Sequence, residues 1–312
     1  MPERRLLVTG ATGFVGRWVL RHWRQEHPRT RLVATSHLPE PDDLPCDGYA
    51  QVDLRDRQAV CRFVAESRPD AVIHLAGLIA SDDLHEQLAV NVEATENLYL
   101  ALLAGPRAAE VRMVQVGSAA AYGAVEAEEL PISEAQPFRP LTPYGLSKAA
   151  QDHLAHMTWR RNHLPIIRAR VFNLLGPGQP AQLVPMTFLT QLAGLRGGEG
   201  GCLRVGDTSA RRDYVDVRDA AAAFDALLQR GQPGQAYNVA TGRDVSVAEL
   251  LEEIFAIAAF TPRVETASDR RRPVDVPCVR ADVSKIDKAT GWRTALSLKQ
   301  SLTDMWESVS RA

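Results

Sequence analysis

The sequence predicts an α/β fold built on a doubly wound parallel sheet, with a smaller α+β region toward the C-terminus. Three observations carry this prediction. Short apolar runs alternate with helical patterns through the first half of the 312 residues. A glycine-rich turn directly follows the first apolar run. The alternation stops near residue 172, and the break at 176–180 reads Gly-Pro-Gly-Gln-Pro. Strands alternating with helices at this pace form a parallel sheet covered on both faces.

The elements expected in the first half are short strands and amphipathic helices. Apolar runs predict strands at 4–9, 31–35, 49–52, 70–75, 111–116 and 165–171. Helical spacing predicts helices at 14–26, 56–67, 84–104 and 143–162. The last of these begins with a proline, which the first turn of a helix tolerates. Residues 123–142 contain three prolines and several acidic residues, so we expect a loop there.

The shorter, glycine- and arginine-rich elements beyond the break predict a second domain. Residues 217–240 are expected to return to the parallel sheet. The first domain is therefore predicted at 1–172 plus about 217–241, and a substrate-binding domain at 173–216 and 242–312.

Composition excludes several classes of protein. Lysine plus arginine total 36 and aspartate plus glutamate 38, so the net charge is −2. A chain without a basic excess is not expected to bind nucleic acid. No apolar run approaches the roughly 18 residues of a membrane span, so no membrane partner is expected. The four cysteines are far apart and form no CxxC pair, which favours free thiols in a reducing cytoplasm.

The glycine-rich turn carries the first functional signal. Residues 9–16 read Thr-Gly-Ala-Thr-Gly-Phe-Val-Gly and place the glycines in a GxxGxxG pattern. Such a turn lets the backbone approach a pyrophosphate, while the helix N-terminus supplies N–H donors and a positive dipole. Gly16 would permit close packing of the helix on the strand. The order strand, turn, helix predicts a dinucleotide site of the Rossmann type, with a ligand-free βα turn as the alternative.

The end of the second expected strand bears on the choice of cofactor. An acidic residue there favours the free 2′-hydroxyl of NAD, whereas a basic one accepts the 2′-phosphate of NADP. Residues 35–37 read Thr-Ser-His, with no acid at the tip. We therefore expect NADP or NAD, with NADPH slightly preferred. Asp53 is expected either to contact the adenine amino group or to be an ordinary turn residue at the end of a strand.

A tyrosine and a lysine four residues apart predict acid–base chemistry. Tyr144 and Lys148 would share one face at the start of a helix. A nearby ammonium favours tyrosinate, so we expect Lys148 to lower the pKa of the Tyr144 phenol. A phenol tuned in this way can give a proton to a carbonyl oxygen while hydride reaches the carbon. Ser118, at the end of an expected central strand, would hydrogen-bond the same oxygen.

These motifs together resemble the extended short-chain dehydrogenases/reductases of the nucleotide-sugar epimerase/dehydratase group, over nearly the whole chain. Within that group the chain is most similar to GDP-4-keto-6-deoxy-D-mannose reductases. The segments that carry the resemblance are 9–16, 74–77, 91–92, 118–123, 144–148, 168–179, 205–207, 212–219, 237–242 and 290–292. The resemblance implies Ser118, Tyr144 and Lys148 as catalytic residues and a nucleoside-diphosphate sugar as substrate, with GDP favoured.

The expected binding residues follow from the motifs and the resemblance. Cofactor contacts are expected at Gly10, Thr12, Gly13, Phe14, Val15, Gly16, Ser36, His37, Asp53, Leu54, Leu75, Ala76, Gly77, Asn91, Val116, Tyr144, Lys148 and Val171. Substrate contacts are implied at Ser118, Tyr144, Asn173, Arg212 and Arg272. Planar guanidinium groups suit bidentate contact with diphosphate oxygens, whereas an exposed surface charge is the alternative for each arginine.

Departures from the family pattern limit the activity. Related dehydratases carry acidic residues, or Ser-Glu, just after the catalytic serine, where this chain has Ala119 and Ala120. Alanine cannot move a proton, so elimination of water is not expected. Leu174 stands where related reductases often carry histidine, so the identity of the sugar is not fixed by the resemblance.

Three functions remain in view: a 4-ketoreductase, a 4-epimerase with tightly bound NAD, and a non-catalytic cofactor-binding protein. By analogy with relatives, a homodimer is expected through helices 84–104 and 144–162. No metal site is expected, because His153 and His156 lack further ligands nearby. His74 is expected to be a satisfied core histidine.

Overall fold

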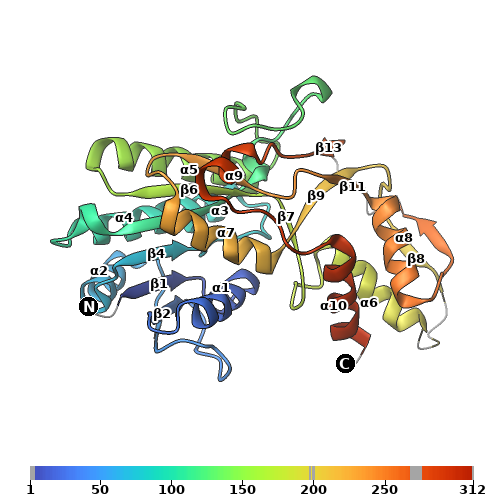
Figure 1. Ribbon diagram of the computed structural model, residues 1–312, viewed down its shortest axis with the longest axis horizontal. Helices are drawn as coiled ribbons and strands as arrows, with labels where there is room; N and C mark the ends of the chain where they lie inside the picture. Colours follow the sequence, from blue (N-terminus) through green and yellow to red (C-terminus); the bar gives the residue numbers. More distant parts are fainter. Residues whose placement is uncertain (1–3, 197, 199–200, 268–275, 311–312) are drawn as a thin grey trace.

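The computed structural model of the protein describes residues 4–196, 198, 201–267 and 276–310. Figure 1 shows a parallel sheet with its helices on the left, and the helices α6 (Val184–Arg196), α8 (Val247–Ala258) and α10 (Leu298–Ser310) on the right. Loops and short strands connect the two units.

The larger sheet has seven parallel strands in the order β10-β6-β5-β4-β1-β2-β3. Their bounds are β1 Arg5–Thr9, β2 Arg31–Ser36, β3 Gly48–Gln51, β4 Ala71–His74, β5 Arg112–Ser118, β6 Ile166–Val171 and β10 Ala236–Val239. This sheet confirms the predicted fold class. Strand β10 joins it beside β6, although more than sixty residues separate them in the chain.

Two apolar cores lie on opposite faces of this sheet. Helices α1 (Phe14–Glu26), α7 (Val217–Arg230) and α9 (Ser284–Thr290) contribute Trp23, Phe224 and Ile286 to one core. Helices α2 (Arg57–Ser67), α4 (Ala94–Leu103) and α5 (Pro143–Asn162) contribute to the other. Burial on both faces explains why the strands read as continuous apolar runs rather than as alternating patterns.

The segment expected to be one helix at 84–104 contains a π-helical turn. Helix α3 (Leu84–Leu88) leads into the turn η1 (Ala89–Glu93), and α4 continues from it. The predicted helix is therefore present over 84–103, with a π turn that the sequence did not predict. A π turn inserts one residue per turn, which the apolar periodicity of the sequence does not reveal. This turn carries the buried Asn91.

The second unit is built on small sheets covered by three helices. Strands β7 (Asn173–Leu175), β9 (Arg211–Asp216), β11 (Asp244–Ser246) and β13 (Cys278–Val279) form one sheet. Strands β8 (Leu203–Val205) and β12 (Val264–Thr266) pair separately.

The first half of the chain also contains three short 3-10 turns, η2 (Ala108–Glu110), η3 (Ala119–Ala121) and η4 (Ala127–Glu129). Helix α9 and Trp292 pack on the core of the first unit, so the chain passes between the units more than twice.

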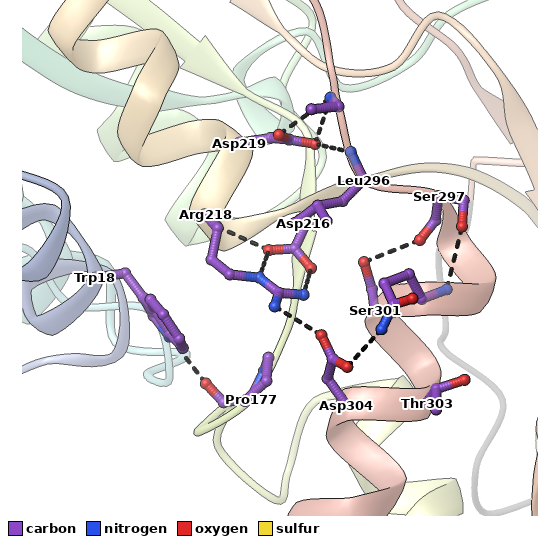
Figure 2. Close-up of polar contacts among 12 residues, drawn as sticks. Trp18, Pro177, Asp216, Arg218, Asp219, Leu296, Ser297, Ser301, Thr303 and Asp304 are labelled. Carbon is purple, nitrogen blue, oxygen red and sulfur yellow. Dashed lines mark hydrogen bonds and ion pairs between the residues drawn. The ribbon is translucent and has the colours of Figure 1, made fainter. Parts of the chain in front are cut away.

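A polar cluster joins the two units. Figure 2 shows the Arg218 guanidinium between Asp216, the N-cap of α7, and Asp304 of α10. Nearby, Trp18 Nε1 of α1 donates to the carbonyl of Pro177, 2.9 Å away. The loop that follows β7 is thereby held against α1.

The cysteines and the lengths of the helices agree with the composition. All four cysteines are free thiols, as expected. Among the residues that the structure describes, no helix is long and apolar enough to cross a membrane.

Candidate active site

A cleft of about 1300 Å³ opens where the carboxyl ends of the sheet strands meet the second unit. One wall comes from the turn after β1 and the ends of β2, β4, β5 and β6; the other comes from residues 173–188 and from β9. Ligands of open α/β sheets bind at this edge, because the loops there converge and the helix N-termini point toward it.

The glycine-rich turn is packed too tightly to accept side chains. Gly10 has φ +65°, and a Cβ there would lie 2.8 Å from Ala76 N. A Cβ on Gly16 would lie 2.4 Å from Gly10 O, so Gly16 lets the helix pack closely, against the turn just after β1 rather than against the strand itself. The N-cap of α1 is Gly13, and no side chain caps the first turn. The turn therefore fits a pyrophosphate, with a bare backbone and uncapped N–H donors beside the cleft.

The adenosine end of the cleft holds an arginine that sequence reasoning missed. Ser36 and His37 line the cleft as expected, and Ser36 Oγ accepts a hydrogen bond from Thr12 Oγ1 at 2.8 Å. Arg55 lines the same region, and its guanidinium donates to both carboxylate oxygens of Asp53, with Nη2 2.7 Å from Oδ2. This pairing lowers the pKa of Asp53. The signal was available, because Arg55 stands two residues after Asp53.

The three expected catalytic residues line one part of the cleft. Ser118 ends β5, while Tyr144 and Lys148 lie on the first turns of α5. Thr142 caps α5, and its Oγ1 accepts from Gly145 N at 3.0 Å. A Cβ on Gly145 would lie 2.6 Å from Ala120 O, so the missing side chain lets α5 approach the turn after Ser118. This close approach brings Tyr144 beside Ser118.

The charges at this site differ from the sequence-based expectation. Burial raises the pKa of Tyr144, and a hydrogen bond with Ser118 opposes that rise. Burial lowers the pKa of Lys148 to about 8. The expectation that Lys148 lowers the pKa of Tyr144 was therefore wrong for the protein alone. The Lys148 ammonium lies over the Tyr144 ring, 5.9 Å from its centre.

The remaining expected cofactor residues fall into two groups. Those that line the cleft are Gly10, Thr12, Gly13, Phe14, Val15, Gly16, Leu54, Leu75, Ala76, Gly77, Val116 and Val171. Asn91 lies behind the wall instead: it is fully buried and bonds Leu78 N and Leu78 O with its amide. The π turn η1 directs this side chain toward the loop after β4, so Asn91 shapes the wall rather than lining it.

The expected substrate residues are placed in part. Asn173, at the start of β7, and Arg212, on β9, line the cleft. One nitrogen of Arg212, Nη1, donates to the carbonyls of Arg211 and Val276, each at 2.8 Å, which fixes the guanidinium against the wall. Arg272 lies outside the described residues. An apolar surface that sequence reasoning missed completes this wall: Leu183, Val184, Phe188, Tyr214 and Val247.

His37 was the only histidine expected at the site, whereas His74 was expected to lie in the core. His74 is buried between Thr9 and Thr95, as predicted, and burial lowers its pKa to about 3. Among the described residues, no cluster of three or more histidine, cysteine or acidic side chains is arranged to hold a metal ion.

Comparisons with known proteins agree with this geometry. The family model described as GDP-mannose 4,6 dehydratase matches residues 7–305. A GDP-6-deoxy-D-mannose reductase from Pseudomonas aeruginosa is 33% identical over 316 residues, covering 98% of each chain. A UDP-glucose 4-epimerase from Neisseria meningitidis serogroup C is 28% identical over 346 residues, covering 98% of this chain and 97% of that one. The solved structure of RMD from Pseudomonas aeruginosa complexed with NADPH superposes with a TM-score of 0.87 at 30% identity, covering 99% and 98% of the two chains.

Proposed function

Since the chain belongs to the GDP-mannose 4,6 dehydratase family of extended short-chain dehydrogenases/reductases, we propose that it is an NAD(P)H-dependent sugar-nucleotide reductase. Its substrate would be a nucleotide-linked 4-keto-6-deoxy sugar, and the keto group at C4 would be reduced. The favoured case is GDP-4-keto-6-deoxy-D-mannose, giving GDP-D-rhamnose. The observation that carries the proposal is the placing of Ser118, Tyr144 and Lys148 in one cleft with only alanines in the turn η3.

The cofactor follows from the glycine-rich turn and the strand tips. The bare turn 10–16 would hold the pyrophosphate of NADP or NAD. No acidic residue stands at the tip of β2, and Arg55 and His37 line the region where the adenosine ribose would lie. A cationic guanidinium favours a 2′-phosphate, so NADPH is preferred.

The chain's own residues would supply the proton and orient the reacting oxygen. When bound, a reduced nicotinamide supplies the hydride for the sugar carbon. Tyr144 then gives its phenolic proton to the oxygen at C4, and its raised pKa keeps that proton in place at neutral pH. Ser118 donates a hydrogen bond to the same oxygen. The Lys148 ammonium stabilises the tyrosinate that remains until solvent returns a proton.

Dehydration is disfavoured by the same turn. Elimination of water needs a second acid or base next to the sugar. The residues after Ser118 are Ala119, Ala120 and Ala121, whose side chains carry no acid or base, and Ala120 N donates to Ser118 Oγ at 3.1 Å. A reductase needs one proton, which Tyr144 can give.

The wall of the second unit would hold the nucleoside diphosphate. Arg212 and Asn173 line it, and Arg212 is already fixed by two backbone carbonyls, so little side-chain entropy would be lost on binding an anion. The apolar side chains of Val184 and Phe188 offer a surface for the base. Arg272 would add a second cation. We retain as a proposal the division at 1–172 plus 217–241 against 173–216 plus 242–312, although α9 and Trp292 of the last range pack on the core of the first unit. The homodimer through helices 84–104 and 144–162 is likewise a proposal.

A second candidate is a 4-epimerase with tightly bound NAD, because it would use the same three residues and a relative of that name matches over 98% of this chain. The two differ in what happens to the cofactor. An epimerase reduces again the sugar that it has oxidised and retains its cofactor, whereas a reductase exchanges it in every turnover.

The test is a consumption assay with purified protein. We expect NADPH absorbance to fall when GDP-4-keto-6-deoxy-D-mannose is added, with one cofactor oxidised per sugar reduced. Protein that isomerises a UDP-sugar with no net oxidation, and that releases NAD only on denaturation, would instead be the epimerase. A panel of nucleoside diphosphates in a thermal-shift assay would identify the base, because a ligand that binds only the native state raises its stability.

A further inference from the structure

A chain of buried hydrogen bonds runs from Lys148 to the first strand of the sheet. Lys148 Nζ donates to Gln151 Oε1 at 3.0 Å, and Gln151 Nε2 donates to Thr95 Oγ1 at 2.8 Å. His74 Nε2 lies 2.9 Å from the same Thr95 oxygen, and His74 Nδ1 lies 2.7 Å from Thr9 Oγ1. All five side chains are at most 6% exposed. This buried network therefore connects Lys148, which lines the cleft, with the interior of the sheet.

Donor and acceptor chemistry orders this chain. The Thr95 hydroxyl donates to Asn91 O at 2.8 Å, so it must accept from both Gln151 and His74. His74 is neutral, hence Nε2 carries its proton and Nδ1 accepts from Thr9. The Thr9 oxygen in turn accepts from Leu75 N and Ala76 N, each at 3.2 Å. Every link then has one donor and one acceptor.

The same logic fixes the orientation of the Gln151 amide. Thr95 Oγ1 has given its only proton to Asn91 and needs a donor, whereas Lys148 has donors alone. A flipped amide would set an N–H against the ammonium and an oxygen against Thr95 Oγ1. Gln151 therefore presents its oxygen to Lys148 and is anchored at its other end.

The surroundings of the ammonium are otherwise sparse. A Cβ on Gly77 would lie 3.0 Å from Lys148 Nζ and 2.8 Å from Asn91 Oδ1, so the ammonium lies close to a bare backbone. The titratable groups that face it are the Tyr144 ring on α5 and His74 on β4. Asp152, next to Gln151, is held by Arg168 and Arg170 of β6. Glu86, on α3, is exposed, as are Glu93 on η1 and Glu96 on α4.

We propose that Gln151 is a positioning residue for the reaction, whose anchored amide oxygen holds the Lys148 ammonium at the place where it supports Tyr144 and the cofactor. This inference rests on the role given to Lys148 in the proposed function. A neutral amide suits the task. It stabilises the buried charge without an ion pair, so the remaining N–H groups of Lys148 stay available to a ligand.

The experiment compares two isosteric variants with a matched control. Gln151→Met keeps the volume of the side chain but removes the acceptor, and Thr95→Val removes the anchor of the amide. Gln115→Met is the control, because Gln115 is an equally buried glutamine, on β5, that bonds Tyr99 rather than Lys148. For each protein we would measure kcat, KM, the pH profile from 6 to 10, NADPH affinity across the same range, and Tm.

The expected result is a loss in catalysis that stability does not explain. Gln151→Met should lower kcat about tenfold, the value of a hydrogen bond to a charged group, with KM for the sugar little changed. Without its acceptor the ammonium is less stable, so the pKa of Lys148 falls. The pH at which activity falls on the alkaline side, and the pH at which NADPH affinity falls, should then both move about one unit lower. Thr95→Val should act in the same direction, and the double variant should be no worse than Gln151→Met. Gln115→Met should lower Tm alone.

Opposite results would overturn the inference. A Gln151→Met enzyme with normal kcat and an unmoved alkaline limb would show that the amide only fills space, as would equal kinetic losses in Gln115→Met. If Gln151→Met does not fold, Thr95→Val decides by the same criteria. If the unaltered protein turns over no 4-keto sugar, the proposed function has failed. The NADPH titrations then test Gln151 by themselves, and identical affinities at every pH would reject its role.

Discussion

Arg218 of α7 donates a hydrogen bond to Asp304 of α10 at 2.6 Å, and this contact joins the two units on either side of the cleft. The same guanidinium holds both oxygens of Asp216, whose side chain is 1% exposed. Figure 2 shows the cluster as a bridge beside the loop at Pro177. One cation thus serves a buried carboxylate and a partly exposed one.

Removing the two ends of this bridge should have unequal effects. Asp304→Ala should lower the free energy of unfolding by about 1 kcal/mol or less, because the pair is partly exposed and solvent screens it. Arg218→Met should cost about 3 kcal/mol, since it leaves the buried Asp216 charge unpaired. Urea unfolding measures both. Arg293→Met is the control: the Arg293 side chain is 79% exposed beside Asp287, and no measurable change is expected. Equal losses in Arg218→Met and Asp304→Ala would contradict the asymmetry.

Tyr144→Phe should abolish reduction while leaving the cleft intact. The change removes the proposed proton donor and keeps the ring, so kcat should fall about 10²- to 10⁴-fold with little change in Tm or NADPH affinity. Steady-state kinetics and a fluorescence titration of NADPH provide the measurements. Unchanged turnover would exclude Tyr144 as the acid and would favour a non-catalytic, cofactor-binding role for the protein.

The activity should fall as the pH rises through the pKa of Lys148. Burial lowers that pKa to about 8, so the side chain is an ammonium below pH 8 and loses its proton above it. If the ammonium supports Tyr144, kcat/KM, which reports the free enzyme, should decline with a midpoint near pH 8. A Lys148→Met variant should be slow at every pH and lack this limb. A profile that stays flat to pH 9.5 would show that the charge on Lys148 is not needed.

Cofactor choice should respond to single changes at the strand tips. Ser36→Asp places an acid at the end of β2, where it would repel a 2′-phosphate, so the ratio of kcat/KM for NADPH over NADH should fall at least about tenfold. Arg55→Ala should weaken NADPH more than NADH. Comparing the two cofactors with one substrate measures both effects. If Arg55→Ala weakens them equally, Arg55 serves only to hold Asp53.

Two glycines provide a matched test of the close-packed turn. Gly16→Ala places a Cβ 2.4 Å from Gly10 O, so it should cost about 1–3 kcal/mol of stability or more and weaken the cofactor. Gly48→Ala, on β3, meets nothing within 4 Å and should change stability by less than about 1 kcal/mol. Thermal unfolding with and without NADPH measures both variants. A stable Gly16→Ala protein with normal cofactor affinity would show that the turn can relax.

The features of this protein that have a local cause could be predicted from the amino-acid sequence. Apolar runs marked the strands β1 to β6 to within two residues at each end. The proline at the first position and the apolar spacing marked α5, Pro143–Asn162, at both ends. The glycine spacing at 10–16 located the tight turn. Each of these depends on neighbouring residues alone: backbone preferences, burial on a face, and the absence of a Cβ.

The contacts of each side chain became evident only from the folded structure. In the folded chain Asp53 pairs with Arg55, and the π turn directs the Asn91 side chain away from the cleft. Burial raises the pKa of Tyr144, whereas the four-residue spacing of Tyr144 and Lys148 predicts a lower pKa. The fold also places Gln151 between Lys148 and Thr95. The physical reason is that desolvation and hydrogen bonding depend on segments that are distant in the chain, and no local pattern records which of them come together.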